Sequence, residues 1–376
     1  MKKRVALLGA SGSIGKNTLD VLREGRDFFE PVLFSAHTRE ESLLALKEEF
    51  PQACLVLSGK KDGPEGIRYF GGEGLREAIA RAKADIVVNG VSGAPGLGAS
   101  LAAIQSGADL ALANKETIVM ASSLVFAEAE KAGVRILPVD SEHSAIFALL
   151  EAHGKERAAE LILTASGGPF RTRSAESLAA VSPGEALAHP VWNMGPKITI
   201  DSATLANKGL EVIEAAGLFG VTPEQVKVVV HPQSVVHSMI RLNDGAVYAQ
   251  LSKPDMRLPI HNALYWPRCL PCPFAQLDFT ELTLEFKKPD FEKFPMLPLA
   301  YEAAKKGGVY PAVYNAANET AVDAFLSGRI GFTDIAGLTR ETLSRDWRIT
   351  ADSLQSIYEA DKMARDSACR YITEQL

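Results

Sequence analysis

Two short segments carry carboxylates at spacings that could bind a metal ion. Asp140-Ser141-Glu142 follows an apolar run that predicts a strand, on which carboxylates at i and i+2 point to the same side. Much later, residues 207–211 predict a helix on which Asn207, Lys208 and Glu211 share much of one face. Taken singly, each acid is as well explained by a strand end or a solvated helix face. Together, Asp140, Glu142 and Glu211 form a set of hard oxygen ligands suited to Mg²⁺ or Mn²⁺ rather than Zn²⁺.

A glycine-rich turn near the start of the chain predicts a dinucleotide site. Residues 5–8 are apolar and predict a strand, Gly9-Ala10-Ser11-Gly12-Ser13-Ile14-Gly15 follows, and residues 14–22 then show helical periodicity. In this arrangement the backbone N–H groups at the helix N-terminus hold a pyrophosphate. The spacing is GxxGxxG, a variant of the common GxGxxG pattern.

The end of the second predicted strand favours NADPH over NADH. NAD enzymes usually place an acid there for the ribose 2′-hydroxyl, whereas this chain has Ala36-His37-Thr38-Arg39. Arg39 is suited to a 2′-phosphate, although a solvated arginine before the next helix is an equally ordinary role for this residue alone.

Composition describes an ordinary globular protein. Of 376 residues, 47% are hydrophobic and 23% are charged. The net charge of −6 gives no electrostatic case for nucleic acid or an anionic membrane, and no apolar stretch approaches the length of a membrane span. The first predicted strand and the glycine turn follow Met1 so closely that a cleaved signal peptide would remove part of the cofactor site, so we expect a cytoplasmic protein.

The four cysteines do not predict a disulfide framework in a chain of this length. Cys269 and Cys272 have CxxC spacing, but the chain has no second pair that would complete a zinc site. We interpret both as incidental loop thiols.

The order of predicted elements indicates an α/β protein of three folded parts. Six strands alternate with helices in the first part, which predicts a Rossmann-like, doubly wound parallel sheet; the strands are residues 5–8, 32–35, 53–57, 86–89, 110–113 and 135–138. Intervening helices are predicted around residues 43–49, 75–83, 101–106 and 124–132.

The pattern changes after residue 139. A hairpin turn at Asn243-Asp244-Gly245 argues for a mixed, α+β sheet, with strands predicted at residues 161–165, 198–200, 226–231, 235–241 and 246–251. A proline-rich stretch predicts an extended linker, and helices around 299–306, 313–326, 335–343 and 354–371 predict a C-terminal helical bundle. The expected division is 1–139 for NADPH binding, 140–266 for metal, substrate and catalysis, 267–291 for the linker and 292–376 for the helical domain.

Four further segments of the middle part are polar in ways that folding alone does not require. The segment 164–170 leaves a strand through Gly167-Gly168, where backbone N–H groups and Ser166 could wrap an anion. The others are 189–195, which contains His189, Trp192 and Met194, then 201–204 before the predicted helix, and 231–234 between strands. Each has an ordinary structural explanation; all four beside a carboxylate cluster are less easily explained that way.

These segments resemble those of the 1-deoxy-D-xylulose 5-phosphate reductoisomerase family. The matching motifs occur in order over most of the chain and are GASGSIG (9–15), ANKE (113–116), PVDSEHSAIF (138–147), TASGGPF (164–170), HPVWNMGPKI (189–198), DSATLANKGLE (201–211), HPQSVVHS (231–238) and KPDMRLPI (253–260).

The resemblance implies a role for each matching residue. Metal ligands would be Asp140, Glu142 and Glu211. Catalytic residues would be Lys115, Glu142 and His189. Substrate would be bound by Lys115, Ser141, Glu142, Ser166, His189, Ser202, Asn207, Lys208 and Glu211, mainly through its phosphate at Ser166, His189, Ser202, Asn207 and Lys208. NADPH would contact Ser11, Gly12, Ser13, Ile14, Ala36, His37, Thr38, Asn114, Glu116 and Gly195. Arg39, at the end of the second predicted strand, would contact its 2′-phosphate.

The activity implied is the NADPH-dependent conversion of 1-deoxy-D-xylulose 5-phosphate to 2-C-methyl-D-erythritol 4-phosphate for isoprenoid synthesis, with Mg²⁺, Mn²⁺ or Co²⁺. A divalent ion would polarise adjacent carbonyl and hydroxyl oxygens, the carbon skeleton would rearrange by retro-aldol and aldol steps, and NADPH would reduce the resulting aldehyde. The resemblance also implies a homodimer, and a flap bearing Trp192 and Met194 that closes over substrate. We expect Trp192 to be substantially exposed without ligand.

Two other functions compete with this one. A metal-free NADP-dependent reductase of another phosphorylated sugar or semialdehyde would stay active after metal removal, but it leaves the three acids without a role. A non-catalytic NADPH-binding regulator would bind cofactor without turnover and would tolerate loss of Lys115.

Overall fold

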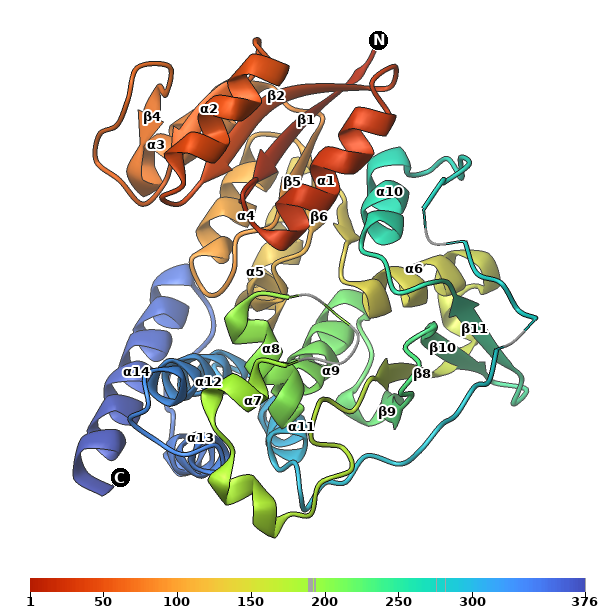
Figure 1. Cartoon of the computed structure of the whole chain (residues 1–376), viewed down its shortest axis with the longest axis vertical. Coiled ribbons are helices and arrows are strands. Elements are labelled where there is room, and N and C mark those ends of the chain that lie inside the picture. Colours follow the sequence, from red (N-terminus) through yellow and green to blue (C-terminus); the bar gives the residue numbers. More distant parts are fainter. Residues whose placement is uncertain (189–191, 193, 275, 281, 376) are drawn as a thin grey trace. The chain divides into compact units, whose positions relative to one another are not determined.

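The computed structural model describes residues 1–188, 192, 194–274, 276–280 and 282–375 (Figure 1). The chain divides into two compact units. We call Met1–Thr117, Val125–Ser144 and Asp255–Gln276 the N-terminal unit, and Ile118–Leu124, Ala145–Pro254 and Leu277–Leu376 the C-terminal unit. The four-part domain division expected from the sequence stays a prediction.

The N-terminal unit is built on a parallel sheet with strand order β4-β3-β2-β1-β5-β6-β7. The predicted doubly wound sheet is therefore confirmed, with a two-residue edge strand, β4, that is too short to show a period. The strands are β1 (Lys3–Leu8), β2 (Phe29–Ala36), β3 (Cys54–Leu57), β4 (Tyr69–Phe70), β5 (Ile86–Asn89), β6 (Asp109–Leu112) and β7 (Ile136–Pro138).

Helices connect most of these strands, as is usual for parallel pairing, whereas a segment without a helix joins β3 to β4. They are α1 (Ser13–Glu24), α2 (Glu40–Glu49), α3 (Gly71–Ala82), α4 (Gly96–Gln105) and α5 (Lys115–Ala132), and α10 (Arg257–Tyr265) joins the unit from much later in the sequence. The central strands are buried on both faces, which explains their continuous apolar sequences.

The C-terminal unit contains a four-stranded mixed sheet in the order β11-β10-β8-β9. β10 is antiparallel to both neighbours and β8 is parallel to β9, so the predicted hairpin and mixed sheet are confirmed. The strands are β8 (Ala158–Ala165), β9 (Val226–Val230), β10 (Val236–Leu242) and β11 (Val247–Leu251).

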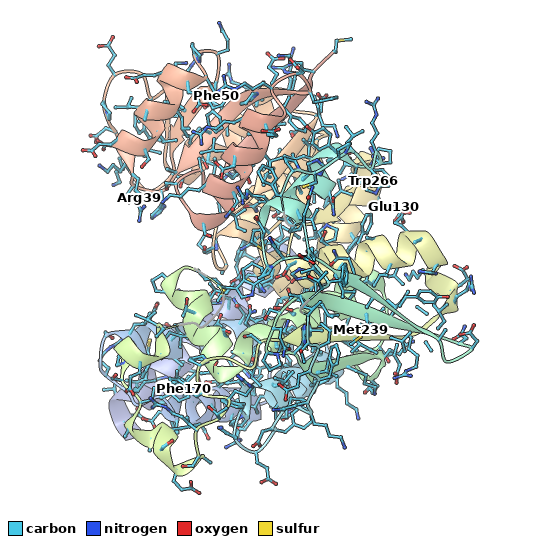
Figure 2. All side chains as sticks on the ribbon, turned by 45° about the vertical axis from the view of Figure 1, so that its right-hand side comes forward. Arg39, Phe50, Glu130, Phe170, Met239 and Trp266 are labelled. Carbon is cyan, nitrogen blue, oxygen red and sulfur yellow. The ribbon has the colours of Figure 1, made fainter. Side chains whose placement is uncertain are left out.

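The apolar core of this unit includes Leu210, Tyr314 and Phe170, the last labelled in Figure 2. Helices make up most of the rest of the unit. They are α6 (Ser141–His153), which begins in the N-terminal unit, α7 (Pro183–Ala186), α8 (Pro196–Thr204), α9 (Ala206–Phe219), α11 (Met296–Lys306), α12 (Tyr310–Leu326), α13 (Asp334–Ser344) and α14 (Leu354–Gln375), with 3-10 turns at Lys155–Arg157, Glu176–Ala180 and Pro223–Gln225. The predicted C-terminal helices are thus confirmed.

One predicted strand is wrong. Residues 198–200, Ile-Thr-Ile, lie inside α8. Their β-branched side chains favour a strand locally, but Pro196 begins the helix and Ile200 and Ala203 are buried at helical spacing. Burial of one helical face outweighs local preference here.

Within the described residues, every helix is either too short or too polar to traverse a lipid bilayer.

Candidate active site

The glycine turn joins β1 to α1 through two close backbone approaches. Gly9 has φ +80°, and a Cβ there would lie 2.8 Å from the carbonyl oxygen of Gly90. A Cβ on Gly15 would lie 2.4 Å from the carbonyl oxygens of Gly9 and Ala10. β1 lies between β2 and β5, which is where the order of strands along the sheet reverses. Dinucleotides bind at the carboxyl edge of such sheets at this switch point.

The segment after β2 is open to solvent. His37, Thr38 and Arg39 are exposed, and Arg39, labelled in Figure 2, directly precedes α2. The His37 ring packs over Gly59, where a Cβ would lie 2.6 Å from the ring. An exposed guanidinium at this strand end suits the phosphate that distinguishes NADPH from NADH.

Asn114 has structural contacts that its sequence motif did not reveal. It caps α5, because its Oδ1 accepts from the backbone N–H of Thr117 at 3.0 Å. Its Nδ2 donates to the carbonyls of Val91 and Gly93 and, at 2.8 Å, to Oε2 of Glu116. Both Asn114 and Glu116 are buried. Asn114 therefore anchors the loop after β5 to the start of α5, at the edge where the cofactor is expected.

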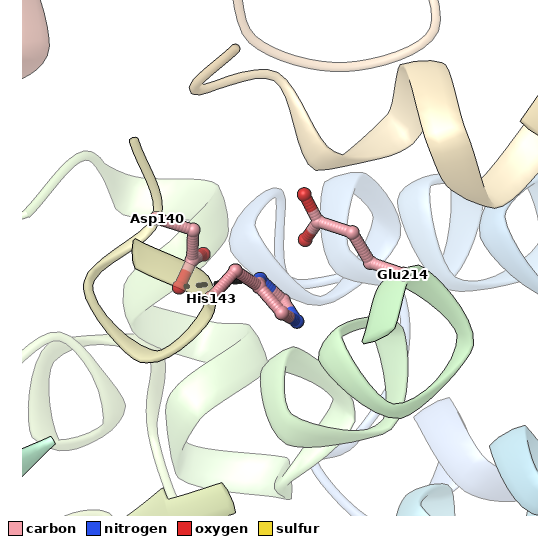
Figure 3. A group of neighbouring side chains, drawn as sticks. All are labelled: Asp140, His143 and Glu214. Carbon is pink, nitrogen blue, oxygen red and sulfur yellow. Dashed lines mark ion pairs between the residues drawn. The ribbon is translucent and has the colours of Figure 1, made fainter. Parts of the chain in front are cut away.

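Lys115 and the start of α6 form a charged group in the N-terminal unit. Nζ of Lys115 lies 2.7 Å from Oδ2 of Asp140, and Oδ1 of Asp140 lies 3.7 Å from Nδ1 of the buried His143. Figure 3 shows the His143 pair as a dashed line. Ser141 donates to Oε2 of the neighbouring Glu142. Lys115 thus directly contacts one of the predicted metal ligands.

The local conformation predicted for this segment is wrong. β7 ends at Pro138 and α6 begins at Ser141, so Asp140 precedes a helix instead of ending a strand. The backbone N–H of Glu142 donates to Oδ1 of Asp140 at 3.3 Å, and an acid accepting at a helix N-terminus is stabilising. Because the segment was interpreted as a strand, His143 was not predicted to lie near Asp140. On a helix, residues spaced i and i+3 are neighbours.

The Gly-Gly turn after β8 is confirmed. Gly167 and Gly168 have φ of +84° and +68°, and the backbone N–H of Gly168 donates to Oγ of Ser166 at 3.3 Å. A Cβ on Gly168 would lie 2.7 Å from the carbonyl oxygen of Ser202 on α8. The structure therefore brings the turn bearing Ser166 against the helix bearing Ser202.

The predicted polar face of α9 is also confirmed. Nδ2 of Asn207 donates to Oε1 of Glu211 at 2.7 Å, and Nζ of Lys208 pairs with Oε2 of the same carboxylate. Lys208 and Glu211 are buried, while Ser202 and Asn207 are partly exposed. Ser166, Ser202, Asn207 and Lys208 thus lie on neighbouring elements of one unit. Figure 3 also labels Glu214, a buried acid one turn further along α9 that is not among the site residues predicted from the sequence.

The proposed flap is only partly described. His189 lies outside the described residues, and Gly195 precedes the first turn of α8. Trp192 is partly buried, with its ring centroid 6.4 Å from that of His237, so the prediction that it is substantially exposed is wrong. Its ring lies near His237 of β10 and is partly accessible to solvent.

Comparison with known proteins agrees with this arrangement. A model of 1-deoxy-D-xylulose 5-phosphate reductoisomerase matches residues 5–122, and two models of C-terminal domains of the same enzyme match residues 136–219 and 251–367. The 1-deoxy-D-xylulose 5-phosphate reductoisomerase of Treponema denticola is 48% identical over 377 residues, covering 100% of this chain and 98% of the relative. The chain belongs to the 1-deoxy-D-xylulose 5-phosphate reductoisomerase family.

Further relatives support the same assignment. The family member of Chlorobaculum tepidum is 48% identical, covering 98% of this chain and 100% of its own. A structure of the Zymomonas mobilis family member in complex with NADPH has a TM-score of 0.92 at 41% identity and covers 100% of both chains. A reductoisomerase in complex with NADPH, fosmidomycin and magnesium has a TM-score of 0.91 at 39% identity, covering 99% of this chain and 98% of its own. The family is enzymatic, so the regulator interpretation falls away.

Proposed function

We propose that this chain converts 1-deoxy-D-xylulose 5-phosphate to 2-C-methyl-D-erythritol 4-phosphate with NADPH and a divalent metal ion, Mg²⁺ or Mn²⁺, with Co²⁺ as an alternative. One observation carries the proposal, namely similarity to reductoisomerases over the full chain. The structures of relatives with NADPH and with magnesium support the choice of cofactors.

In this proposal Asp140, Glu142 and Glu211 each offer one carboxylate oxygen to the same ion. The donor set fits Mg²⁺ or Mn²⁺, because all three ligands are hard oxygens. Nδ1 of His143 lies 3.7 Å from Oδ1 of Asp140, and we assign His143 to orienting the Asp140 carboxylate rather than to binding the ion. The ion would supply positive charge that polarises the substrate's carbonyl and hydroxyl oxygens.

The protein's own side chains would carry the remaining steps. Lys115, which is buried and paired with Asp140, would donate a hydrogen bond or a proton to a substrate oxygen that becomes negatively charged. Ser141 and Glu142 would bind the hydroxyl and carbonyl end of the substrate. The segment carrying His189, Trp192 and Met194 would exclude water while hydride is transferred.

The phosphate end of the substrate would bind in the C-terminal unit. Ser166 lies on a turn whose backbone N–H groups suit an anion, and Ser202 lies on the helix that this turn approaches. Lys208 would supply positive charge and Asn207 a further donor from α9. The glycine turn after β1, with Ser11, Gly12, Ser13 and Ile14, would hold the pyrophosphate of NADPH.

Incubating the purified protein with 1-deoxy-D-xylulose 5-phosphate, NADPH and Mg²⁺ tests the function. We expect one molecule of NADPH, followed by its absorbance, to be oxidised for each molecule of 2-C-methyl-D-erythritol 4-phosphate that forms. A metal-free reductase would turn over equally well after chelation. No product with any of the three ions would contradict the proposal.

We further propose a homodimer. β11 is an edge strand of its sheet and exposes Val247 and Tyr248, and an edge of this kind needs covering. Sedimentation at micromolar concentration should give the mass of two chains, and a monomer would contradict the proposal. The four cysteines are all free, which supports a proposed location in the cytoplasm, to be checked by cell fractionation.

A further inference from the structure

α12 contacts both helices that carry the proposed phosphate ligands. Tyr314 and Asn318 are four residues apart and therefore lie along the same side of α12. Tyr314 approaches α9 and Asn318 approaches α8. One side of a single helix thus touches the segments bearing Ser202 and Lys208.

The contact with α9 is a close packing of backbone against side chain. A Cβ on Gly209 would lie 2.8 Å from the hydroxyl of Tyr314 and 2.6 Å from Cβ of Ala300 on α11. The Tyr314 hydroxyl donates to the carbonyl of Met296 at 3.1 Å. Burial, reinforced by the negative charge of Asp201, raises the pKa of Tyr314 well above its ordinary value, so the hydroxyl keeps its proton. The first turn of α9 is therefore held at a defined distance from α12.

The contact with α8 is a buried hydrogen bond to a carboxylate. Asp201 is only 1% exposed and accepts from Nδ2 of Asn318 at 2.8 Å. Nζ of Lys197, one turn earlier on α8, lies 2.8 Å from the other carboxylate oxygen. Burying charged groups costs free energy that an apolar pair of similar size would avoid. Because of this cost, we infer that the hydrogen bond between Asn318 and Asp201 serves to fix the position of α8. Ser202 is the residue that directly follows Asp201.

The link between the two helices is short and strained. Leu205 joins α8 to α9 in the left-handed region, with φ +60°, which is unfavourable for a residue with a side chain. Such a conformation persists only where the surroundings hold it. The position of Ser202 relative to Asn207 and Lys208 therefore depends on the anchoring of both helices.

We propose that Asn318 is a positioning residue for phosphate binding. It acts through Asp201, which it holds by a hydrogen bond. Ser202 is thereby kept at the distance from Asn207 and Lys208 that one phosphate group requires. The inference rests on the proposed function, because the phosphate site itself belongs to that proposal. Asn318 itself need not touch substrate.

Comparison of Asn318→Ala with Asn315→Ala tests this role. Asn315 is equally buried on the same helix and donates to Glu319 at 3.2 Å, so its removal costs a similar hydrogen bond without involving α8. In Asn318→Ala we expect the KM for the sugar phosphate and the inhibition constant of inorganic phosphate both to rise about tenfold, which is the loss of roughly one hydrogen bond. The dissociation constant of NADPH should not change, and Asn315→Ala should affect melting temperature alone.

Exchanging the side chains of Asn318 and Asp201 is a second test of the same role. Asn318→Asp alone places two carboxylates together and should weaken phosphate binding. Adding Asp201→Asn restores an amide facing a carboxylate and should recover most of the lost affinity. Equal phosphate affinity in Asn318→Ala and Asn315→Ala, or no recovery in the exchanged pair, would overturn the inference. If the unmutated enzyme neither turns over the sugar phosphate nor is inhibited by phosphate, it is the proposed function that fails.

Discussion

Nζ of Lys115 lies 2.7 Å from Oδ2 of Asp140, and the two side chains are only 6% and 12% exposed. An ammonium in such surroundings is a stronger hydrogen-bond donor than one in water, because little solvent competes. This pair places a positive charge beside a predicted metal ligand and at the start of the helix that follows the cofactor edge of the sheet.

Lys115→Met keeps the length of the side chain and removes its charge. We expect kcat to fall at least about 100-fold, since the charge acts on an oxygen that becomes anionic in the transition state. The dissociation constant of NADPH, measured by fluorescence, should stay within about twofold of the unmutated value. Lys306→Met, which removes an exposed pair with Glu302, is the control and should leave kcat unchanged. A Lys115→Met enzyme with ordinary kcat would contradict the assigned role.

Arg39→Asp addresses cofactor choice. The unmutated enzyme should prefer NADPH, and the substitution should reduce that preference by roughly 1–3 kcal/mol, the range of a charge-assisted contact. The measurement is kcat/KM with each nicotinamide cofactor. Arg76→Asp, at another exposed arginine of the same unit, should leave the ratio unchanged. Equal efficiency with NADH and NADPH in the unmutated enzyme would show that Arg39 does not read the 2′-phosphate.

Gly168→Ala tests the approach of the anion-binding turn to α8. The alanine needs φ near +68°, and its Cβ would meet the carbonyl oxygen of Ser202 at 2.7 Å. We expect a loss of about 1–3 kcal/mol in stability and a KM for the sugar phosphate that rises at least about tenfold. Gly328→Ala has a similar backbone penalty, at φ +71°, but an open space for its Cβ. That control should lose stability alone; equal KM values in the two variants would count against a phosphate site at this turn.

Much of this arrangement follows from local sequence. The glycine turn, the hairpin at Asn243-Asp244-Gly245 and the shared face of Asn207, Lys208 and Glu211 are short-range patterns, and the structure confirms them. Their geometry depends on residues within one or two turns of each other, which the order of residues specifies directly.

The features that sequence missed depend on contacts between distant segments. Ile198-Thr199-Ile200 looks like a strand because its helix is stabilised by burial of Ile200 and Ala203. The bond between Asn318 and Asp201 joins residues 117 positions apart, and no local pattern marks it. His143 was the exception, since a helix starting at Ser141 places it beside Asp140 by spacing alone.

The lowered pKa of Asp255 predicts how acid changes the stability of the N-terminal unit. Burial alone would raise the pKa of this carboxyl, but hydrogen bonds from the side chain and backbone of Arg257 outweigh it and hold the pKa below its ordinary value. A carboxyl whose pKa is lower in the folded state stabilises the fold at pH values above its unfolded-state pKa of about 3.9. This stabilisation is lost as the pH falls through the folded-state pKa. Asp255→Asn should therefore lower the melting temperature at pH 7, with the difference shrinking below about pH 4. A difference that grows on acidification would show that the sign is wrong.

Metal-dependent turnover by Glu211→Gln tests the central claim most directly, because the substitution keeps the shape of the side chain and removes one ligand charge. With NADPH, sugar phosphate and Mg²⁺ present, kcat should fall by more than about 100-fold while NADPH binds as before, and chelation should abolish turnover of the unmutated enzyme until Mg²⁺ is restored. Glu302→Gln, at an exposed acid of α11, should keep full activity. Near-normal kcat in Glu211→Gln, or full activity of the unmutated enzyme after chelation, would contradict a metal site formed by Asp140, Glu142 and Glu211.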